Sequence, residues 1–219
     1  MNLLDFLGLN MSNYPTIYTM RHSTTDYNLQ KRYAGTLDVP LTNTAIELTR
    51  KASKKLGGMR FDVIITSTLK RAIQTVRHLL GDDILFIKCA ECIERNYGTM
   101  QGLTEDEVKL IEPKVEFFKV ADYYYSLNPP HGETFDMLRK RVEKFYQLIV
   151  EKYKGLSILV ISHGVFLQQF HGLIRGLDWK TSLETDLVQP LVLTRFRFRG
   201  NLLLSNSTFK LLEIDKENW

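Results

Sequence analysis

Hydrophobic residues occur along the chain in two patterns. Short runs rich in β-branched residues alternate with longer segments in which apolar positions recur every three or four residues. This alternation predicts an α/β fold with a mainly parallel central sheet flanked by helices. The predicted strands cover residues 16–20, 62–66, 84–88, 157–161 and 191–198, with a last one near 209–214.

The helical segments are easier to delimit. One helix is predicted over residues 44–56 and another over 68–80, and each is followed by glycine, which favours the position after a helix. A third begins at Thr104, where T-E-D-E forms a capping box. The longest ends near residue 153, and a fifth follows His163 and ends near residue 176. The longest is predicted from one apolar stripe of Phe135, Leu138, Val142, Phe145 and Ile149.

No linker rich in glycine, serine or proline divides the chain, so we expect one domain over residues 1–219. Residues 1–10 precede a second methionine and are interpreted as an N-terminal extension. Residues 113–132 interrupt the regular pattern, and we expect this insert to form a lid over a site. It contains Phe117, Phe118, Tyr123, Tyr124 and Tyr125 ahead of two prolines.

Charge and composition argue against several classes of function. The 29 basic and 25 acidic residues give a net charge of +4 without a long basic run, which favours a small anionic ligand over nucleic acid. No apolar run approaches the roughly 18 residues that span a bilayer, and the N-terminus lacks the basic start of a signal peptide. We therefore expect a cytoplasmic protein without a membrane partner. Cys89 and Cys92 have C-x-x-C spacing, but nothing nearby completes a zinc site, so free thiols and no metal are expected.

Reactive residues follow three of the predicted strands. Arg21 and His22 follow the first strand, Arg71 comes shortly after the second, and His163 follows the fourth. Because ligands bind beyond the carboxyl ends of the strands in such sheets, these residues should share one pocket. Two guanidiniums and two helix N-termini would favour a tetrahedral anion such as phosphate.

The same residues point to phosphoryl transfer. A neutral histidine is a competent phosphoryl acceptor, and neighbouring cations disfavour its protonation. The leaving alkoxide also needs a proton donor. Glu94 is the candidate acid and Glu133 its rival. The other histidines, His78, His131 and His171, are expected to be packed or solvent-facing side chains.

A series of motifs carries a resemblance to a known family. M-R-H-S-T-T-D-Y-N at 20–28 is followed by Y-A-G-T-L-D-V-P-L-T at 33–42, T-S-T-L-K-R-A-I-Q-T at 66–75, E-R-N-Y-G-T-M-Q-G-L-T at 94–104, H-G-E-T-F at 131–135 and S-H-G at 162–164. In this order they resemble the histidine phosphatase superfamily, also called the phosphoglycerate mutase-like family, whose signature is R-H-G-E-T-x-x-N. Ser23 and Thr24 stand where that signature has glycine and glutamate.

The resemblance implies a fold and a site. The implied fold is a three-layer sandwich of the phosphoglycerate mutase-like type. The implied catalytic residues are His22 as nucleophile, Glu94 as proton donor and His163, which also binds phosphate. The other implied residues are Arg21, Arg71, Asn28 and Gly164 around the phosphate, and Gly35, Thr36 and Tyr97 on the substrate side.

The resemblance also implies an activity. We expect a phosphomonoester hydrolase that acts on a small phosphorylated metabolite through a phosphohistidine, of the metal-independent histidine acid phosphatase type and without a cofactor. One alternative is a bisphosphoglycerate-dependent phosphoglycerate mutase, but the family's mutases carry a paired arginine where this chain has the aromatic stretch V-E-F-F-K-V-A-D-Y-Y-Y. Another is a catalytically silent phosphate-binding protein. A homodimer is compatible with each of these.

Overall fold

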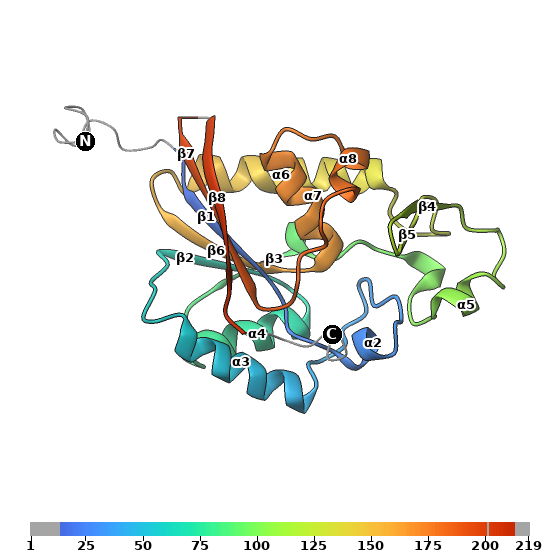
Figure 1. Ribbon diagram of the computed structural model, residues 1–219, viewed down its shortest axis with the longest axis horizontal. Helices are drawn as coiled ribbons and strands as arrows, with labels where there is room; N and C mark the ends of the chain where they lie inside the picture. Colours follow the sequence, from blue (N-terminus) through green and yellow to red (C-terminus); the bar gives the residue numbers. More distant parts are fainter. Residues whose placement is uncertain (1–13, 201, 213–219) are drawn as a thin grey trace.

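The computed structural model describes residues 14–200 and 202–212. Its centre is a six-stranded sheet with the strand order β3-β2-β6-β1-β7-β8 (Figure 1). Strands β3, β2, β6 and β1 run parallel. At one edge, β7 is antiparallel to β1, and β8 is antiparallel to β7. The predicted mainly parallel α/β fold is confirmed. The strands of this sheet are β1 (Thr16–Arg21), β2 (Val63–Ser67), β3 (Ile87–Cys89), β6 (Ser157–Ser162), β7 (Val192–Arg199) and β8 (Leu202–Lys210).

The sheet is buried on both faces, and its central strand β6 has an uninterrupted apolar run. In β6, Ile158 and Val160 join one core cluster, whereas Leu159 and Ile161 join the other. Helices α3 (Asn43–Lys55) and α4 (Lys70–Leu80) cover one face (Figure 1). The opposite face is covered by α6 (Phe135–Lys152), α7 (Gly164–Ile174) and α8 (Trp179–Leu183). The result is the expected three-layer arrangement.

Short elements lie around the carboxyl ends of the parallel strands. They are α2 (Asp26–Leu29), α5 (Glu105–Val108) and the 3₁₀ turns η1 (Ala90–Cys92) and η2 (Gly98–Met100). The predicted capping box at the start of α5 is confirmed, because Thr104 Oγ1 accepts from the Glu107 backbone N–H and the Glu107 carboxylate accepts from that of Thr104.

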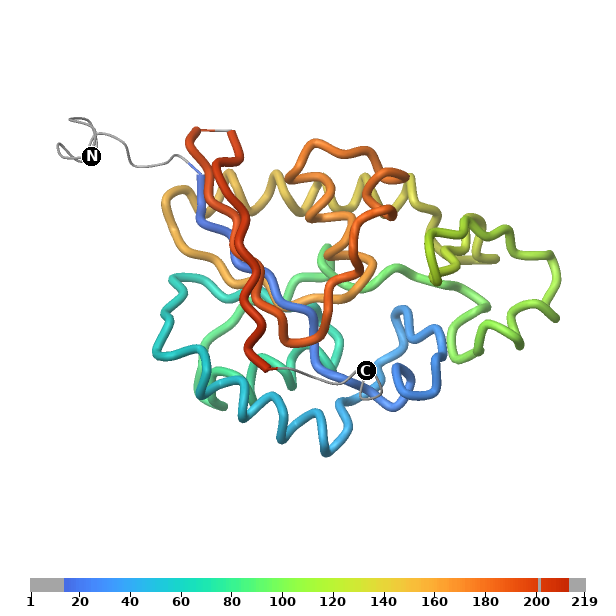
Figure 2. Tube along the Cα trace, viewed as in Figure 1, coloured from blue at the N-terminus to red at the C-terminus, as the bar shows by residue number. Residues whose placement is uncertain are grey.

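The aromatic insert has regular structure that the sequence did not predict. Strands β4 (Phe117–Val120) and β5 (Tyr123–Ser126) form an antiparallel hairpin. Figure 2 shows the green chain of this hairpin and α5 projecting to one side of the six-stranded sheet. Tyr125 is anchored in the core, where its ring packs edge-on against Phe135.

Three predicted boundaries differ from the structure. The helix predicted from residue 68 begins at Lys70, because Leu69 has the extended backbone of an N-cap residue. The strand predicted over 84–88 is the shorter β3. The last strand, predicted near 209–214, is β8, which begins earlier because the chain reverses at Gly200 (φ +57°) and pairs at once with β7. Residues 213 and 214, like the expected extension over 1–10, lie outside the described residues.

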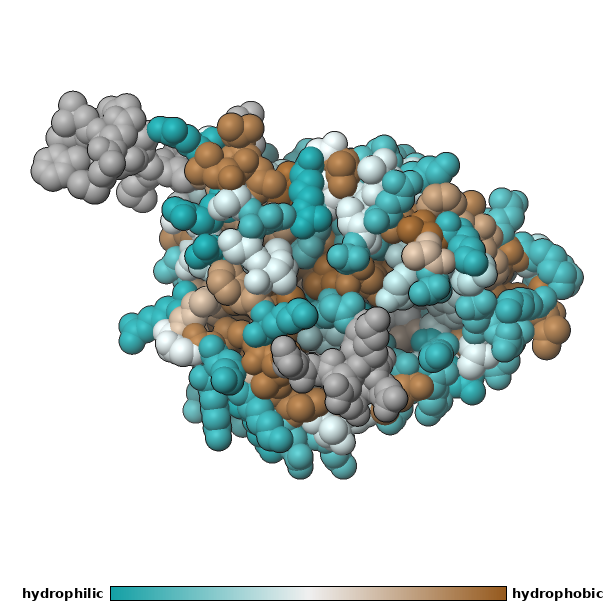
Figure 3. Space-filling view, in the orientation of Figure 1, coloured by the Kyte–Doolittle hydropathy of each residue, from teal (hydrophilic) through white to brown (hydrophobic). Residues whose placement is uncertain are grey.

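None of the helices in the described part of the chain is long and apolar enough to cross a membrane. The face shown in Figure 3 is mostly hydrophilic, with hydrophobic side chains in separate groups. One of these groups lies at the end of the β7–β8 hairpin, where Leu202 and Leu204 are exposed.

Candidate active site

The carboxyl ends of β2, β6 and β1 are neighbours in the sheet, which brings distant residues together. Thr66 pairs with Ile161 and Arg21 pairs with Ser162, so the residues that follow these strands share one edge. A pocket of about 160 Å³ opens there. Its lining is Arg21, His22, Asn28, Arg32, Tyr33, Ala34, Gly35, Arg71, Glu94, Tyr97, Gly164, Val165 and Leu187.

Arg71, in the first turn of α4, is the central contact of this pocket. Its Nε lies 3.2 Å from His22 Nε2 and 3.2 Å from His163 Nδ1. Its two terminal nitrogens donate to the carbonyl oxygens of Leu37 and Gly35, each at 2.7 Å. Burial lowers the pKa of Arg71 to about 10, so the side chain stays charged at neutral pH.

His22 is held in one tautomer. Its Nδ1 lies 2.5 Å from the carbonyl oxygen of Ser23, so Nδ1 carries the proton and donates it there. The lone pair is then on Nε2, which faces Arg71 and the pocket. Burial, and after it the charges of Arg71 and Arg21, lower the pKa of His22 well below its usual value. His22 is therefore neutral and able to act as a nucleophile.

His163 occupies the N-cap position of α7. It is also neutral, because burial is the main cause that lowers its pKa and the charge of Arg71 lowers it further. Its Nδ1 accepts from Arg71, and its Nε2 lies 2.7 Å from Ser67 Oγ. The rings of His22 and His163 stand edge to face.

Arg21 has a donor without a partner. Its Nη1 donates to the carbonyl oxygen of Val188 at 3.1 Å, whereas its buried Nε has no hydrogen-bond partner among the described residues. The guanidinium lies against Gly164, where a Cβ atom would sit 3.2 Å from Arg21 Cζ. A glycine at this position thus leaves room for Arg21 beside the N-terminus of α7. Burial is the main cause of the lowered pKa of Arg21, which Glu94 partly offsets.

Glu94 reaches the pocket from the segment after η1. Its Oε1 accepts from the backbone N–H groups of Arg95 (2.8 Å) and Phe166 (3.1 Å), and its Oε2 accepts from that of Val165 (3.2 Å). The carboxylate therefore lies at the first turn of α7, and Glu94 lines the pocket.

The rival acid Glu133 is placed differently. Its carboxylate forms a two-pronged ion pair with Arg141, at 2.8 Å and 2.7 Å, and it lines an adjoining pocket of about 290 Å³ instead.

The chain is similar to known proteins over most of its length. The family model of the histidine phosphatase superfamily (branch 1) matches residues 17–206. The chain belongs to this superfamily. A 2,3-bisphosphoglycerate-dependent phosphoglycerate mutase from Bartonella tribocorum is 29% identical over 205 residues, which cover 88% of this chain and 97% of the relative.

Solved structures of the histidine phosphatase superfamily share the fold. An α-ribazole phosphatase from Shigella flexneri matches with a TM-score of 0.72 and 20% identity, covering 86% of this chain and 93% of its own. A phosphoserine phosphatase from Entamoeba histolytica in complex with 3-phosphoglyceric acid matches with a TM-score of 0.71 and 22% identity, covering 90% of this chain and 100% of its own. The phosphoglycerate mutase-like fold inferred from the motifs is confirmed.

The remaining positions that the family motifs singled out do not all line the pocket. Asn28, Gly35 and Tyr97 line the pocket. Asn28 Oδ1 also accepts from Thr25 at the start of α2, and burial raises the pKa of Tyr97. Thr36 does not line this pocket, because its backbone N–H and hydroxyl both donate to Gln101 Oε1 and it faces the adjoining pocket.

Ser23, one of the two residues that depart from the family signature, points away from the site. Ser23 is buried, its hydroxyl donates to the carbonyl oxygen of Ala45 at 3.3 Å, and its backbone N–H donates to Thr75 Oγ1. Its φ is not positive, so a side chain causes no backbone strain there.

Some lining residues were missed from the sequence. Arg32, Tyr33 and Ala34 precede Gly35 directly, so the Y-A-G-T motif could have indicated part of this set, whereas Val165 follows the quoted S-H-G motif and Leu187 comes from a loop without a motif. No residue of 113–132 lines the pocket. Tyr123 nevertheless raises the pKa of Arg21 slightly, after the larger effects of burial and Glu94.

The other histidines and the thiols lie outside the pocket. His171 is buried, with Nε2 2.7 Å from Thr19 Oγ1 and its ring against Phe196. Cys89 and Cys92 are free thiols. Within residues 14–200 and 202–212, no group of three or more His, Cys, Asp or Glu side chains is placed to hold a metal ion.

Proposed function

We propose that the chain is a phosphomonoester hydrolase that needs no metal and acts on a small phosphorylated metabolite through a phosphohistidine at His22. The observation that carries this proposal is the tautomer of His22. Because Nδ1 is committed to the Ser23 carbonyl, the Nε2 lone pair faces a pocket that also contains Arg21 and Arg71.

The reaction has two balanced steps. In the first, His22 Nε2 attacks phosphorus and the ester P–O bond breaks, while Glu94 gives a proton to the leaving alkoxide. In the second, Glu94 takes a proton from water as the water attacks phosphohistidine, which releases inorganic phosphate and restores the imidazole. Arg21, Arg71 and the N-terminus of α7 neutralise the phosphoryl oxygens. The free Nε of Arg21 supplies one unused donor.

The charge of the pocket favours hydrolysis over the mutase reaction. Its lining contains three guanidiniums, which supply enough positive charge for one phosphate dianion. A bisphosphorylated intermediate carries more negative charge and needs further cations. The lysines of the insert do not line the pocket. Lys119 lies over the ring of Tyr124, and Lys114 pairs with Glu112. The mutase is the second candidate because relatives that cover nearly the whole chain bear that name.

Two assays test the proposal. Purified protein should hydrolyse 4-nitrophenyl phosphate in the presence of EDTA, and His22→Asn should lower this activity at least about a thousandfold, as loss of a nucleophile does. Radiolabel from the substrate should appear as acid-labile phosphohistidine in quenched wild-type protein only. Isomerisation of 3-phosphoglycerate that requires 2,3-bisphosphoglycerate would instead favour the mutase. Phosphate binding without turnover would favour a silent binding protein.

A cytoplasmic location belongs to the same proposal. The free thiols Cys89 and Cys92 fit a reducing compartment.

A further inference from the structure

The H-G-E-T motif packs against the segment that carries Glu94. The backbone N–H of Glu133 donates to the carbonyl oxygen of Asn96 at 2.7 Å, and Arg95 Nε donates to the carbonyl oxygen of Glu133 at 2.7 Å. A Cβ atom on Gly132 would lie 2.8 Å from the Asn96 carbonyl oxygen, so the two segments approach each other closely. This contact brings Glu133 next to the irregular stretch that follows η1.

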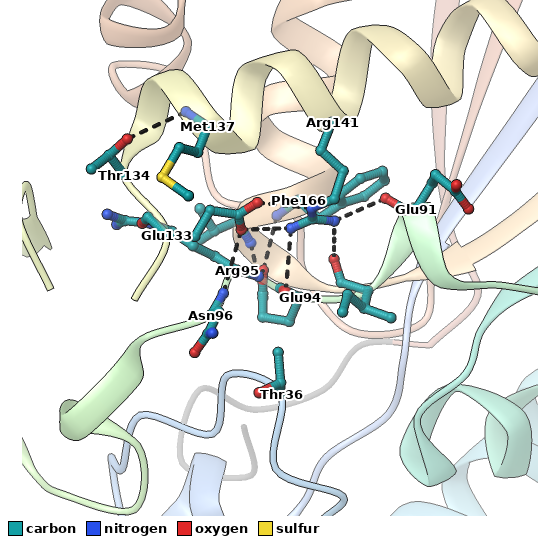
Figure 4. Close-up of polar contacts among 12 residues, drawn as sticks. Thr36, Glu91, Glu94, Arg95, Asn96, Glu133, Thr134, Met137, Arg141 and Phe166 are labelled. Carbon is teal, nitrogen blue, oxygen red and sulfur yellow. Dashed lines mark hydrogen bonds and ion pairs between the residues drawn. The ribbon is translucent and has the colours of Figure 1, made fainter. Parts of the chain in front are cut away.

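Arg141 joins α6 to the same stretch. Its Nε and Nη2 hold the Glu133 carboxylate, and Nη1 and Nη2 also donate to backbone carbonyls (Figure 4). Nη1 lies 2.8 Å from the Glu91 oxygen and 2.9 Å from the Ile93 oxygen, and Nη2 lies 3.4 Å from the Glu94 oxygen. The side chains of Arg141 and Glu133 are only 19% and 12% exposed, so solvent competes little for these bonds.

We infer that the ion pair of Glu133 and Arg141 positions Glu94 for proton transfer, an inference that rests on the acid role proposed for Glu94. The carboxylate end of Glu94 is fixed by backbone N–H groups of α7, and its main chain is fixed by Arg141. Residues 93–97 belong to no helix or strand, so contacts with other segments hold them in place. A general acid must lie within hydrogen-bond reach of the leaving oxygen, so a small shift of this stretch lowers the rate of proton transfer.

The chemistry of arginine suits this role. Its planar fork binds a carboxylate on one edge while donating to carbonyls on another, whereas lysine offers a single charged centre. Arg141→Lys keeps the charge of α6 and loses the fork. Glu133→Gln keeps the shape and loses the ion pair. The two variants are thus independent perturbations of one contact.

The experiment compares leaving groups. Turnover of 4-nitrophenyl phosphate, whose leaving group needs no proton, is measured beside turnover of 2-glycerophosphate, whose leaving group does. We expect Arg141→Lys and Glu133→Gln to lower kcat on 2-glycerophosphate at least about tenfold and kcat on 4-nitrophenyl phosphate less than about threefold, because only the alkoxide depends on the acid. The inhibition constant of inorganic phosphate should change less than about twofold, since the phosphate pocket is untouched.

A double variant separates positioning from general stability. Adding Arg141→Lys to Glu94→Gln should cause no further loss on 2-glycerophosphate, because both changes remove one function. Arg139→Lys is the matched control, since Arg139 pairs with Glu143 at 3.1 Å on the same helix, away from the pocket. Its ratio of the two activities should equal that of wild type.

Each outcome decides the inference. Equal losses on both substrates, additive losses in the Glu94→Gln background, or unchanged ratios in both single variants would overturn it. If Arg141→Lys does not fold, Glu133→Gln and its combination with Glu94→Gln give the same comparison. If Glu94→Gln by itself fails to discriminate between the leaving groups, the acid proposed for the reaction is wrong, a result distinct from failure of the positioning role alone.

Discussion

The imidazole rings of His22 and His163 lie edge to face with their centroids 5.0 Å apart. Arg71 Nε donates to both rings, and among the described residues neither histidine has a carboxylate partner that would stabilise its cation. Burial and the neighbouring guanidiniums lower the pKa of both. Two neutral rings beside fixed positive charge are the arrangement that the proposed phosphoryl transfer to His22 requires.

Arg71→Lys should therefore be a severe change despite conserving charge. Lysine cannot replace the contacts of one guanidinium with two rings and two loop carbonyls. We expect kcat/KM for 4-nitrophenyl phosphate to fall at least about a hundredfold. Arg77→Lys, an exposed change on the same helix, should leave it within about twofold. Equal activity of the two variants would contradict the phosphate role of Arg71.

Buried neutral histidines should also make stability depend on pH. Burial lowers the pKa of His171 to about 3, whereas the unfolded chain has a histidine pKa of about 6.5. Between these values the unfolded state binds one more proton at this residue, so its contribution to stability is complete above pH 6.5 and falls as the pH decreases. The slope is about 1.4 kcal/mol per pH unit for each such histidine.

His171→Asn should remove the contribution of this one proton to the pH dependence of the free energy of unfolding. The measurement is the free energy of unfolding by urea at several pH values between about 4 and 6. Its slope should decrease by about 1.4 kcal/mol per pH unit relative to wild type. His78→Asn is the control, because His78 is only half-buried. An unchanged slope in His171→Asn would show that this ring is protonated in the folded state.

The sequence predicted the parts of the site that lie on regular elements. The uninterrupted apolar run of β6 identifies a central strand, and Ser162, His163 and Gly164 follow it directly, so the rule for strand ends suffices. The apolar stripe of α6 was equally clear. These features depend on residues that are neighbours along the chain.

What the sequence could not predict depends on contacts between distant segments. Thr36 faces away from the pocket because the chain turns at Gly35 (φ +49°) and the Thr36 backbone N–H donates to the side chain of Gln101. Leu187 enters the pocket from a loop that only the fold places there. The start of strand β8 was placed too late because it is an exposed edge strand without an apolar alternation. The partners of Glu94 are backbone N–H groups of α7, which no side-chain motif records.

Two glycines of α7 should separate phosphate binding from stability. In Gly164→Ala the new methyl group would press on Arg21 Cζ and Nε, at 3.2 Å and 3.3 Å. We expect the inhibition constant of inorganic phosphate to rise about tenfold, equivalent to about 1.4 kcal/mol. The free energy of unfolding should stay equal or rise by up to about 1 kcal/mol, because alanine favours a helix.

Gly172→Ala should show the opposite behaviour. Its Cβ atom would meet Ser182 Oγ and lie 2.5 Å from Ser182 Cβ, where α7 packs on α8. The protein should lose about 1–3 kcal/mol of stability from overpacking. Phosphate inhibition of the folded variant should match wild type. Parallel effects of both substitutions on phosphate inhibition would remove Gly164 from its proposed place beside the anion.

Ser23→Gly tests the departure from the family signature. The Ser23 hydroxyl donates to the carbonyl oxygen of Ala45 in α3, away from the pocket, and the backbone there is one that any residue adopts. Glycine removes a buried hydrogen bond and adds freedom to the unfolded chain, so stability should fall by about 1–2 kcal/mol. Because His22 Nδ1 donates to the backbone oxygen of residue 23, which glycine retains, kcat/KM for 4-nitrophenyl phosphate should stay within about threefold. A large gain in kcat would mean that serine constrains the nucleophile at this position.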